Sequence, residues 1–257
     1  MKTILLTLSY DGTDFCGWQK QKETITGKVR TVQEELEKVL EIIHKEPVQA
    51  CGSGRTDSGV HASYQAVTFI SPIDSIPTEK YIPAINSLLP HDIRIMSAEE
   101  KPKGFHARYN ATSRSYRYYM WTGDTPPAKE MRYIWPLFRQ PDIEKLNAMA
   151  SHLQGEIDCT TFSAAGDKSI SKSRYLEKAF FYQEGEKLVF EIEANAFLWK
   201  MVRSITGTLI HFEKQGYPAE YFKEVLDAKN RKLAGPTAPS TGLFLYQVKF
   251  DGIRRAP

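Results

Sequence analysis

The segment CGSGRTDSGVHA, residues 51–62, gathers an arginine, an aspartate and a histidine between glycines. The aspartate, Asp57, has a side chain that can act as a nucleophile, a general base or a metal ligand. The segment lacks the cluster of carboxylates or histidines that a metal site needs, so nucleophile or base remains. A neighbouring arginine, Arg55 or Arg203, would keep the carboxylate ionised, because a positive charge lowers the pKa of an adjacent acid.

The glycines at positions 52, 54 and 59 indicate a tight loop that can approach a ligand closely, since glycine permits a positive φ. An ordinary turn explains them as well, because turns favour Gly, Ser and Asp. The segment matches neither a phosphate-binding loop nor the GxSxG nucleophile elbow. The zinc deaminase motif also fails, because no Glu stands two residues after His61. Residue types alone therefore leave the function of the loop open.

Basic and aromatic side chains in three other segments favour an RNA substrate. FHARYNATSRSYRYYMW, residues 105–121, alternates Arg with Tyr, which suits contacts with phosphates and unstacked bases. Three basic residues, Lys168, Lys172 and Arg174, fall in a polar loop that we interpret as flexible and able to hold an RNA backbone. We expect Lys200 and Arg203 on one helix surface. A solvated face is the alternative for each charged cluster.

The aromatic residues of segment 105–121 have two interpretations. A strand with an aromatic core face explains Tyr118 and Trp121 better than RNA binding does. Tyr116 is less easily explained in this way and stays a candidate for stacking on a base. The histidines at positions 44, 91, 152 and 211 lack a partner pattern and are interpreted as structural or surface residues.

These residues must be positioned by interleaved strands and helices. Alternating apolar residues predict a strand over 4–10, and a capping box at Thr31 predicts a helix in TVQEELEKVLEIIHK. Asp142 is expected to cap a second helix, and a hairpin is expected to turn near Gly185. Further helices are predicted at 78–89, 196–212 and 218–229, and further strands at 65–70, 93–97, 113–122 and 242–250. The pattern indicates an α+β fold of two halves with antiparallel or mixed pairing.

The composition is that of an ordinary globular protein. The 257 residues are 41% hydrophobic and 25% charged, with a net charge of +3 that is too mild to name a polyanionic partner. Three widely spaced cysteines indicate reduced thiols, not a disulfide framework or a zinc site. The absence of a long apolar run and of a signal-peptide pattern leads us to expect a cytoplasmic protein with no membrane partner.

Six segments taken in order resemble the bacterial tRNA pseudouridine synthase A family. They are YDGTDFCGWQKQ, TVQEELEKVL, GSGRTDSGVHA, FHARYNATSRSYRYY, NAFLWKMVR and APSTGLFL, and they span nearly the whole chain. The resemblance implies two ferredoxin-like halves that share a large, mainly antiparallel sheet, with the site in the cleft between them. Residues 1–105 would carry the catalytic Asp loop, and residues 106–257 the Tyr and Arg of the cleft.

The resemblance also implies roles for individual residues. Asp57 corresponds to the catalytic nucleophile, Arg203 to the arginine that pairs with it, and Tyr116 to the tyrosine that stacks on the target uracil. Arg55 is implicated in handling the flipped base or a phosphate. Leu243 or Leu245 would form the apolar wall under the base. The candidates for holding the rest of the RNA are Arg114, Lys168, Lys172 and Arg174.

The implied activity is the conversion of uridine to pseudouridine at positions 38, 39 and 40 in the anticodon stem-loop of tRNA, by a homodimer without metal or organic cofactor. Two alternatives stay open: a non-catalytic RNA-binding module, and a different aspartate-dependent enzyme such as a nucleoside or phosphoester hydrolase. The segment at 22–29 is longer than the short basic loop expected there, which puts its RNA contacts in doubt. Ser58 stands where alanine is common, and we expect no change in chemistry from it.

Overall fold

The computed structural model describes residues 1–21 and 29–255, so most of the unusual segment at 22–29 lies outside the described residues. The chain forms two compact units. Unit 1 consists of Met1–Ala111 and Leu245–Asp251, and unit 2 of Thr112–Phe244 and Gly252–Pro257. Unit 1 extends past residue 105 because Ala107 packs with Leu5 and Ala66. The segment 245–251 belongs to unit 1 because Val248 packs against the same cluster.

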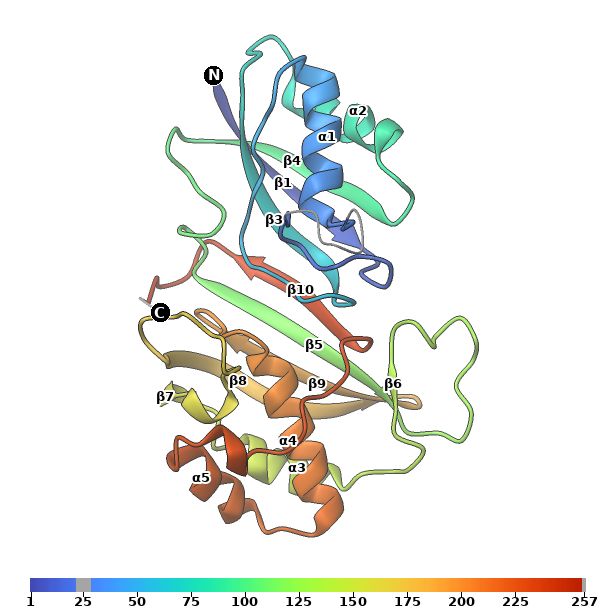
Figure 1. The fold of residues 1–257 in the computed structure, drawn as a ribbon, viewed down its shortest axis with the longest axis vertical. Helices are drawn as coiled ribbons and strands as arrows, with labels where there is room; N and C mark the ends of the chain where they lie inside the picture. Colours follow the sequence, from blue (N-terminus) through green and yellow to red (C-terminus); the bar gives the residue numbers. More distant parts are fainter. Residues whose placement is uncertain (22–28, 256–257) are drawn as a thin grey trace. The chain divides into compact units, whose positions relative to one another are not determined.

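Unit 1 has the element order of a ferredoxin-like half (Figure 1). Its elements are β1 (Lys2–Tyr10), α1 (Val32–His44), β2 (Cys51–Gly52), β3 (His61–Ser71), α2 (Tyr81–Leu88) after a 3-10 turn at Thr78–Lys80, and β4 (Ile93–Lys101). The strands lie in the order β4-β1-β3, and β2 pairs with β3. All of these pairs are antiparallel. The loop that carries Asp57 therefore joins two strands that pair with each other.

Both helices of unit 1 cover one face of its sheet. Ile4 pairs in register with Phe69 of β3, and both side chains are buried. The Phe69 ring lies 5.8 Å from the ring of His44 in α1 and 5.3 Å from that of Tyr81 in α2, measured between centroids. The predicted alternation over 4–10 is confirmed, because Ile4, Leu6 and the following even-numbered residues form this buried face.

Unit 2 also alternates strands and helices. Its elements are β5 (Ser113–Trp121), β6 (Trp135–Pro136), α3 (Ile143–Ala150), β7 (Gly155–Asp158), β8 (Ser173–Glu184), β9 (Lys187–Ala194), α4 (Met201–Gln215) and α5 (Ala219–Asp227), with 3-10 turns at Thr160–Phe162 and Arg231–Leu233. The strands follow the order β5-β9-β8-β7 with antiparallel pairs, and β6 pairs with β5 in parallel. The last strand, β10 (Leu243–Lys249), begins in unit 2 and continues in unit 1. The predicted α+β class with a large, mainly antiparallel sheet is confirmed.

Three local predictions are confirmed. The Thr31 hydroxyl caps α1 by accepting a hydrogen bond from the Glu34 amide, and the Asp142 carboxylate caps α3 by accepting one from the Lys145 amide. The hairpin between β8 and β9 turns at Gly185, whose φ is +59°. Short-range side-chain chemistry is sufficient for each of these features.

The start of α4 differs from the prediction. The periodic pattern predicts a helix over 196–212, but α4 begins at Met201. Lys200 precedes it with a left-handed backbone, at a φ of 59°. Lys200 therefore does not share a helix surface with Arg203, and that prediction is wrong. Apolar periodicity continues through 196–200 although the backbone there turns, so the pattern alone could not place the boundary.

The two faces of the unit 2 sheet have different chemistry. Tyr116 and Tyr118 of β5 lie on one face, and Tyr118 is fully buried opposite Phe190 of β9. The core interpretation of Tyr118 is therefore confirmed. The other face carries an ion pair between Arg117 and Glu191, with Nε and Oε2 2.7 Å apart.

The helices are short. The longest in the described part of the chain, α4, has 15 residues, whereas a bilayer span takes about 20. None of the helices within residues 1–21 and 29–255 combines the length and the apolar character of a membrane span.

Candidate active site

The first residues of the Asp57 loop are fixed to β3. The Ser53 hydroxyl donates to Oε1 of Gln65 at 2.6 Å, and Nε2 of Gln65 donates to the Gly54 carbonyl at 2.9 Å. The Ser53 amide also donates to the Ala66 carbonyl at 2.8 Å. Because Gln65 is fully buried, these bonds hold the start of the loop without competition from water.

The residue before Asp57 is held by the last residue of β1 and by the segment that follows β1. The Thr56 hydroxyl lies 2.8 Å from the Tyr10 hydroxyl in a buried hydrogen bond. The Thr56 carbonyl accepts a hydrogen bond from the Trp18 amide at 3.1 Å. Side chain and backbone of Thr56 are therefore both anchored, and Asp57 is attached to a fixed backbone.

The end of the loop is anchored in the same way. The Gly59 amide and the Ser58 hydroxyl both donate to the Phe15 carbonyl at 3.2 Å. The Val60 amide donates to the Asp57 carbonyl at 3.2 Å, which closes a tight turn. Asp57 is half-buried in this turn, and Arg55 is exposed. The loop thus presents a carboxylate from a rigid frame, as a nucleophile or general base requires.

The three glycines of the segment have different roles. Gly59 has a φ of +75°, which a residue with a Cβ rarely adopts. A Cβ on Gly52 would lie 2.6 Å from the Trp18 ring, so this position needs glycine for close packing. Gly54 has no positive φ and no atom within 4 Å of an added Cβ. Of these three glycines, only Gly59 has the expected positive φ, and close approach of the loop to a ligand stays a prediction.

Two glycines of the segment 10–21 allow the backbone of this segment to pack closely against the loop that carries Asp57, and residue types alone do not reveal this role. A Cβ on Gly12 would lie 2.0 Å from the Val60 carbonyl oxygen. Gly17 has a φ of +89°, and its Cβ would lie 2.5 Å from the Thr56 carbonyl oxygen. Their spacing in YDGTDFCGW was a visible signal, but its meaning depends on contacts with residues 39 and 48 positions further along the chain.

His61 fixes the loop to the same segment. Its side chain is fully buried, and Nδ1 accepts a hydrogen bond from the Gly12 amide at 3.0 Å. Oδ1 of Asp11 lies 3.2 Å from the same nitrogen. The geometry gives His61 a positioning role at the start of β3.

In unit 2, Arg203 is oriented by two hydrogen bonds at the first turn of α4. Its Nε donates to the Ala238 carbonyl at 2.9 Å, and the Ala238 amide donates to the Arg203 carbonyl at 3.0 Å. Burial raises the pKa of Tyr118, and the positive charge of Arg203 acts in the opposite direction. The guanidinium group is thus within electrostatic reach of Tyr118, whose hydroxyl donates to the Pro239 carbonyl.

Tyr116 lies on the same face of β5 as Tyr118, and its side chain is 8% exposed. Its ring meets that of Phe197 edge to face, with the centroids 5.1 Å apart. Asp57 belongs to unit 1, whereas Arg203 and Tyr116 belong to unit 2. The pairing of Asp57 with Arg203 and the stacking of Tyr116 on a base stay predictions.

Two of the predicted RNA-binding residues turn inward. Arg114 is buried, and its Nη1 donates to the Asn195 carbonyl at 2.7 Å. Arg174 lies in β8 and not in the predicted polar loop. It is also buried, and its Nη1 donates to the carbonyls of Ser171 and Ser173. Burial lowers the pKa of Arg174. Both guanidinium groups have structural hydrogen bonds, and their contact with RNA stays a prediction.

The two lysines of the polar loop differ from each other. Lys172 forms an ion pair with Asp167, with Nζ and Oδ1 2.5 Å apart, whereas Lys168 is exposed. The Asp167 carboxylate also accepts hydrogen bonds from the amides of Ser169 and Trp199. The loop forms a turn organised around one buried carboxylate, and its flexibility stays a prediction.

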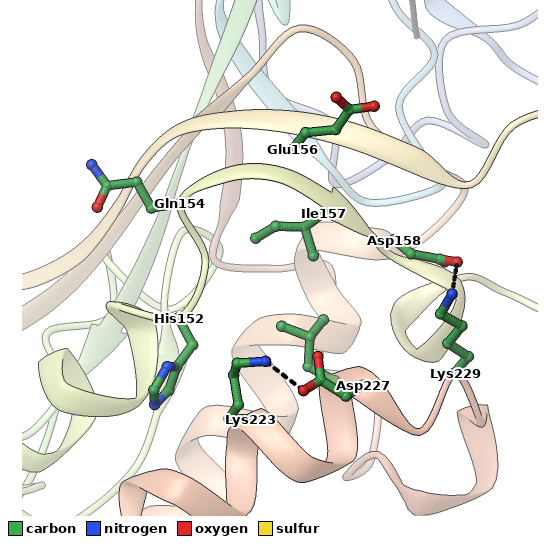
Figure 2. A pocket seen from close by; sticks show the side chains of 9 residues that line it. His152, Gln154, Glu156, Ile157, Asp158, Lys223, Asp227 and Lys229 are labelled. Carbon is green, nitrogen blue, oxygen red and sulfur yellow. Dashed lines mark hydrogen bonds and ion pairs between the residues drawn. The ribbon is translucent and has the colours of Figure 1, made fainter.

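A shallow pocket in unit 2 contains none of the predicted site residues (Figure 2). It is lined by β7, the segment that leads into β7, α5 and Lys229, and two of its lysines form ion pairs with aspartates. Lys229 lies 3.0 Å from Asp158, and Lys223 pairs with Asp227. Within the ranges 1–21 and 29–255, no group of three His, Cys, Asp or Glu side chains is arranged to hold a metal ion.

Comparison with known proteins identifies the family. Residues 7–110 and 149–251 match the family model described as tRNA pseudouridine synthase. The chain belongs to the tRNA pseudouridine synthase family. The match includes Asp57 in its first part and Arg203 in its second, whereas Tyr116 falls between the two parts.

Curated relatives agree with this assignment. The tRNA pseudouridine synthase A of Treponema denticola is 56% identical over 257 residues, which cover 100% of this chain and 96% of the relative. The enzymes of the same name from Anoxybacillus flavithermus and Bacillus subtilis are each 39% identical. Those alignments cover 98% and 95% of this chain and 100% and 98% of the relatives. The predicted enzyme class, a tRNA pseudouridine synthase that isomerises uridine, is confirmed.

Proposed function

We propose that this enzyme converts uridine to pseudouridine at positions 38, 39 and 40 of the tRNA anticodon stem-loop, and that Asp57 starts the reaction as nucleophile or base. The observation that carries the proposal is the loop between β2 and β3, in which both neighbours of Asp57 are hydrogen-bonded to the segment 10–18. A carboxylate on a fixed backbone suits a reaction whose substrate must be held in one orientation.

The chemistry sets four requirements. The N1–C1′ bond of uridine must break, the freed uracil must stay bound and rotate, and C5 must then bond to C1′. The C5 proton leaves and N1 gains a proton, so the substrate and product have the same mass. An ionised Asp57 can serve as nucleophile or base, and Arg203 is proposed to keep it ionised by a nearby positive charge.

The target base must also leave the helical stack. Unstacking costs a few kcal/mol, and stacking on an aromatic ring such as Tyr116 contributes about 1 to 3 kcal/mol. We propose that exposed basic residues, Arg55 and Lys168 among them, hold the stem-loop by its phosphates. Recognition by shape needs little base readout, which fits action at three neighbouring positions.

The sequence resemblance supports a homodimer that uses neither metal nor organic cofactor. The cytoplasm is proposed as the place of action because the tRNA substrate is found there. Leu243 and Leu245 are both buried, so either can supply the apolar wall under the base.

The test is tritium release from tRNA labelled at uracil C5, with wild type, Asp57→Ala and Asp57→Asn, each with and without a chelator. We expect release by wild type in both conditions and a rate lower by at least about 10⁴-fold in both variants, with tRNA binding retained. Asp227→Ala is the matched control, because this exposed aspartate on α5 pairs only with a surface lysine in the contacts described above.

Three outcomes would contradict the proposal. Weak tRNA binding with a normal rate in the Asp57 variants would remove Asp57 from the chemistry. Binding without any release by wild type would favour a non-catalytic RNA-binding module. Free base or free phosphate as product would indicate a hydrolase, since an isomerase conserves the mass of its substrate.

A further inference from the structure

Trp199 is an exposed tryptophan in the turn before α4. Its side chain is 48% exposed, whereas Trp18 and Trp121 are buried and Trp135 is half-buried. All four tryptophans lie in described residues. Tryptophan buries a large apolar area in cores and interfaces, so a ring held at the surface indicates a contact with another molecule.

The backbone of Trp199 is fixed by the loop 164–172. Its amide donates to Oδ2 of Asp167 at 2.6 Å, and its carbonyl accepts from the Ala164 amide at 3.1 Å. The ring packs on Gly166, where an added Cβ would lie 2.7 Å from Cζ3 of the indole. The ring is therefore exposed and yet positioned, so it loses little conformational freedom when it binds a partner.

Asp167 is the anchor of this arrangement. Burial by itself raises the pKa of its carboxyl, but the hydrogen bonds from Lys172, the Trp199 amide and Ser169 outweigh that effect and hold the pKa well below its usual value. The side chain is only 5% exposed. Its negative charge is thus compensated by Lys172 and by hydrogen bonds within the loop, and its burial shields it from a ligand that approaches Trp199.

The exposed side chains of the loop that positions the ring, and of the residue that follows Trp199, are apolar or positively charged. Nζ of Lys200 lies 5.0 Å from the centroid of the Trp199 ring. Lys168 and Ile170 are both exposed on the loop that positions the ring, and Ile170 is fully exposed. An aromatic ring, an aliphatic side chain and two ammonium groups match the needs of an unpaired nucleotide, which offers a base for stacking and phosphates for ion pairing.

We infer that Trp199 is a stacking platform for an unpaired base of the RNA substrate, and that Lys168 and Lys200 contact the adjacent phosphates. The inference rests on the proposed function for the identity of the RNA. A base takes the place of the Lys200 ammonium over the indole, and the ammonium moves to a phosphate. Stacking of this kind tolerates any base, which suits an enzyme that accepts several tRNAs.

The experiment measures tRNA affinity and steady-state kinetics of Trp199→Ala and Trp199→Phe at one fixed salt concentration. We expect Trp199→Ala to raise the Kd and KM for tRNA by about 5- to 150-fold, with kcat at saturating tRNA unchanged. Trp199→Phe should recover most of the affinity because it keeps a stacking ring. Intrinsic fluorescence of wild type should be quenched by tRNA, and Trp199→Phe should lose that quenching.

A double-mutant cycle with Gly166 separates stacking from a structural role. Gly166→Ala pushes the indole ring from its place, so it should weaken tRNA binding in the wild type but have no further effect in the Trp199→Ala background. The matched control is Phe180→Ala. This residue is another exposed ring of unit 2, and Nζ of Lys178 lies 5.7 Å from its centroid.

Several results would overturn the inference. They are wild-type affinity in Trp199→Ala, an equal loss of affinity in Phe180→Ala, or additive effects of Gly166→Ala and Trp199→Ala. A changed sedimentation coefficient of Trp199→Ala without a change in Kd would assign the ring to an interface between two copies of the chain. Failure of the proposed function is distinguishable, because wild type would then release no tritium from labelled tRNA whatever the variants bind.

Discussion

Gly17→Ala tests whether the segment 10–18 positions the loop that carries Asp57. Gly17 has a φ of +89°, and an added Cβ would lie 2.5 Å from the Thr56 carbonyl oxygen, 3.1 Å from the Asp57 carbonyl carbon and 3.2 Å from the Ser58 nitrogen. All three atoms belong to the backbone on either side of the Asp57 side chain. None is the end of a flexible side chain, so the loop itself must move.

Gly17→Ala should lower both the stability of the protein and its kcat. A left-handed alanine costs about 1 to 2 kcal/mol relative to glycine, and overpacking costs about 1 to 3 kcal/mol more, so we expect a loss of about 2 to 5 kcal/mol in the free energy of unfolding. Ordinary contact with the Thr56 oxygen requires a shift of roughly 1 Å. A misplacement of about 1 Å in an active site lowers the rate by about 100-fold, and we expect a fall of that order in kcat.

Gly104→Ala is the matched control for the backbone strain. Gly104 has a φ of +88°, but no atom lies within 4 Å of an added Cβ. It should lose about 1 to 2 kcal/mol of stability and keep a kcat within about 2-fold of wild type. The assays are single-turnover tritium release from tRNA labelled at uracil C5, and urea unfolding of both variants.

The reasoning is refuted if Gly17→Ala folds and turns over at the wild-type rate. It is also refuted if Gly104→Ala loses as much activity as Gly17→Ala, because strain alone would then explain the effect. A Gly17→Ala variant with a raised KM and a normal kcat would show that the segment binds RNA and does not position Asp57.

Three further predictions concern the loop 164–172 and the start of β8. Lys168→Ala should lower the slope of log Kd for tRNA against log salt by about 1, because this lysine is exposed and able to contact a phosphate. An unchanged slope would show that Lys168 is a solvated surface residue without a phosphate contact. Arg174→Ala should lower the melting temperature, because this guanidinium is buried and bonded to carbonyls; an unchanged melting temperature would contradict that. Asp167→Asn should lower the free energy of unfolding at neutral pH, and the gap to wild type should narrow as pH falls below about 3.8; a gap independent of pH would exclude the ion pair as its cause.

The sign of the Asp167 effect follows from its depressed pKa. Its folded pKa lies below the unfolded value of 3.8, so the ionised carboxylate stabilises the folded state above that pH. Protonation at lower pH removes this contribution as the pH falls toward the folded pKa. Asparagine has no such ionisation, so its stability should not show this dependence.

Local features of the fold were predictable from the sequence. The capping residues Thr31 and Asp142 and the turn at Gly185 depend on contacts within four residues, and each was found where the sequence placed it. The start of α4 was not predicted correctly, because the pattern of apolar residues is the same before and after Lys200, whose backbone is left-handed. Periodicity reports which face is buried, but it does not report φ.

The basic residues between positions 168 and 174 show a second limit of prediction from the sequence. Lys168, Lys172 and Arg174 look alike in the sequence, yet one is exposed, one pairs with Asp167 and one is buried. The difference depends on how the chain folds back on itself, which no single residue type encodes. Asp167 itself could have been noticed as the only acid between residues 159 and 176.

By itself, the sequence determined the α+β class and the family, and it led to the prediction that Asp57 is catalytic, because each depends on residue types in a fixed order along the chain. Only the tertiary structure decided that Asp57 stands on a rigid loop. The contacts that make it rigid join Tyr10 to Thr56 and Phe15 to Ser58, across more than 40 residues of chain. Which pairs of distant residues meet depends on the register of β1 against β3, and that register results from the burial of one whole face of the sheet.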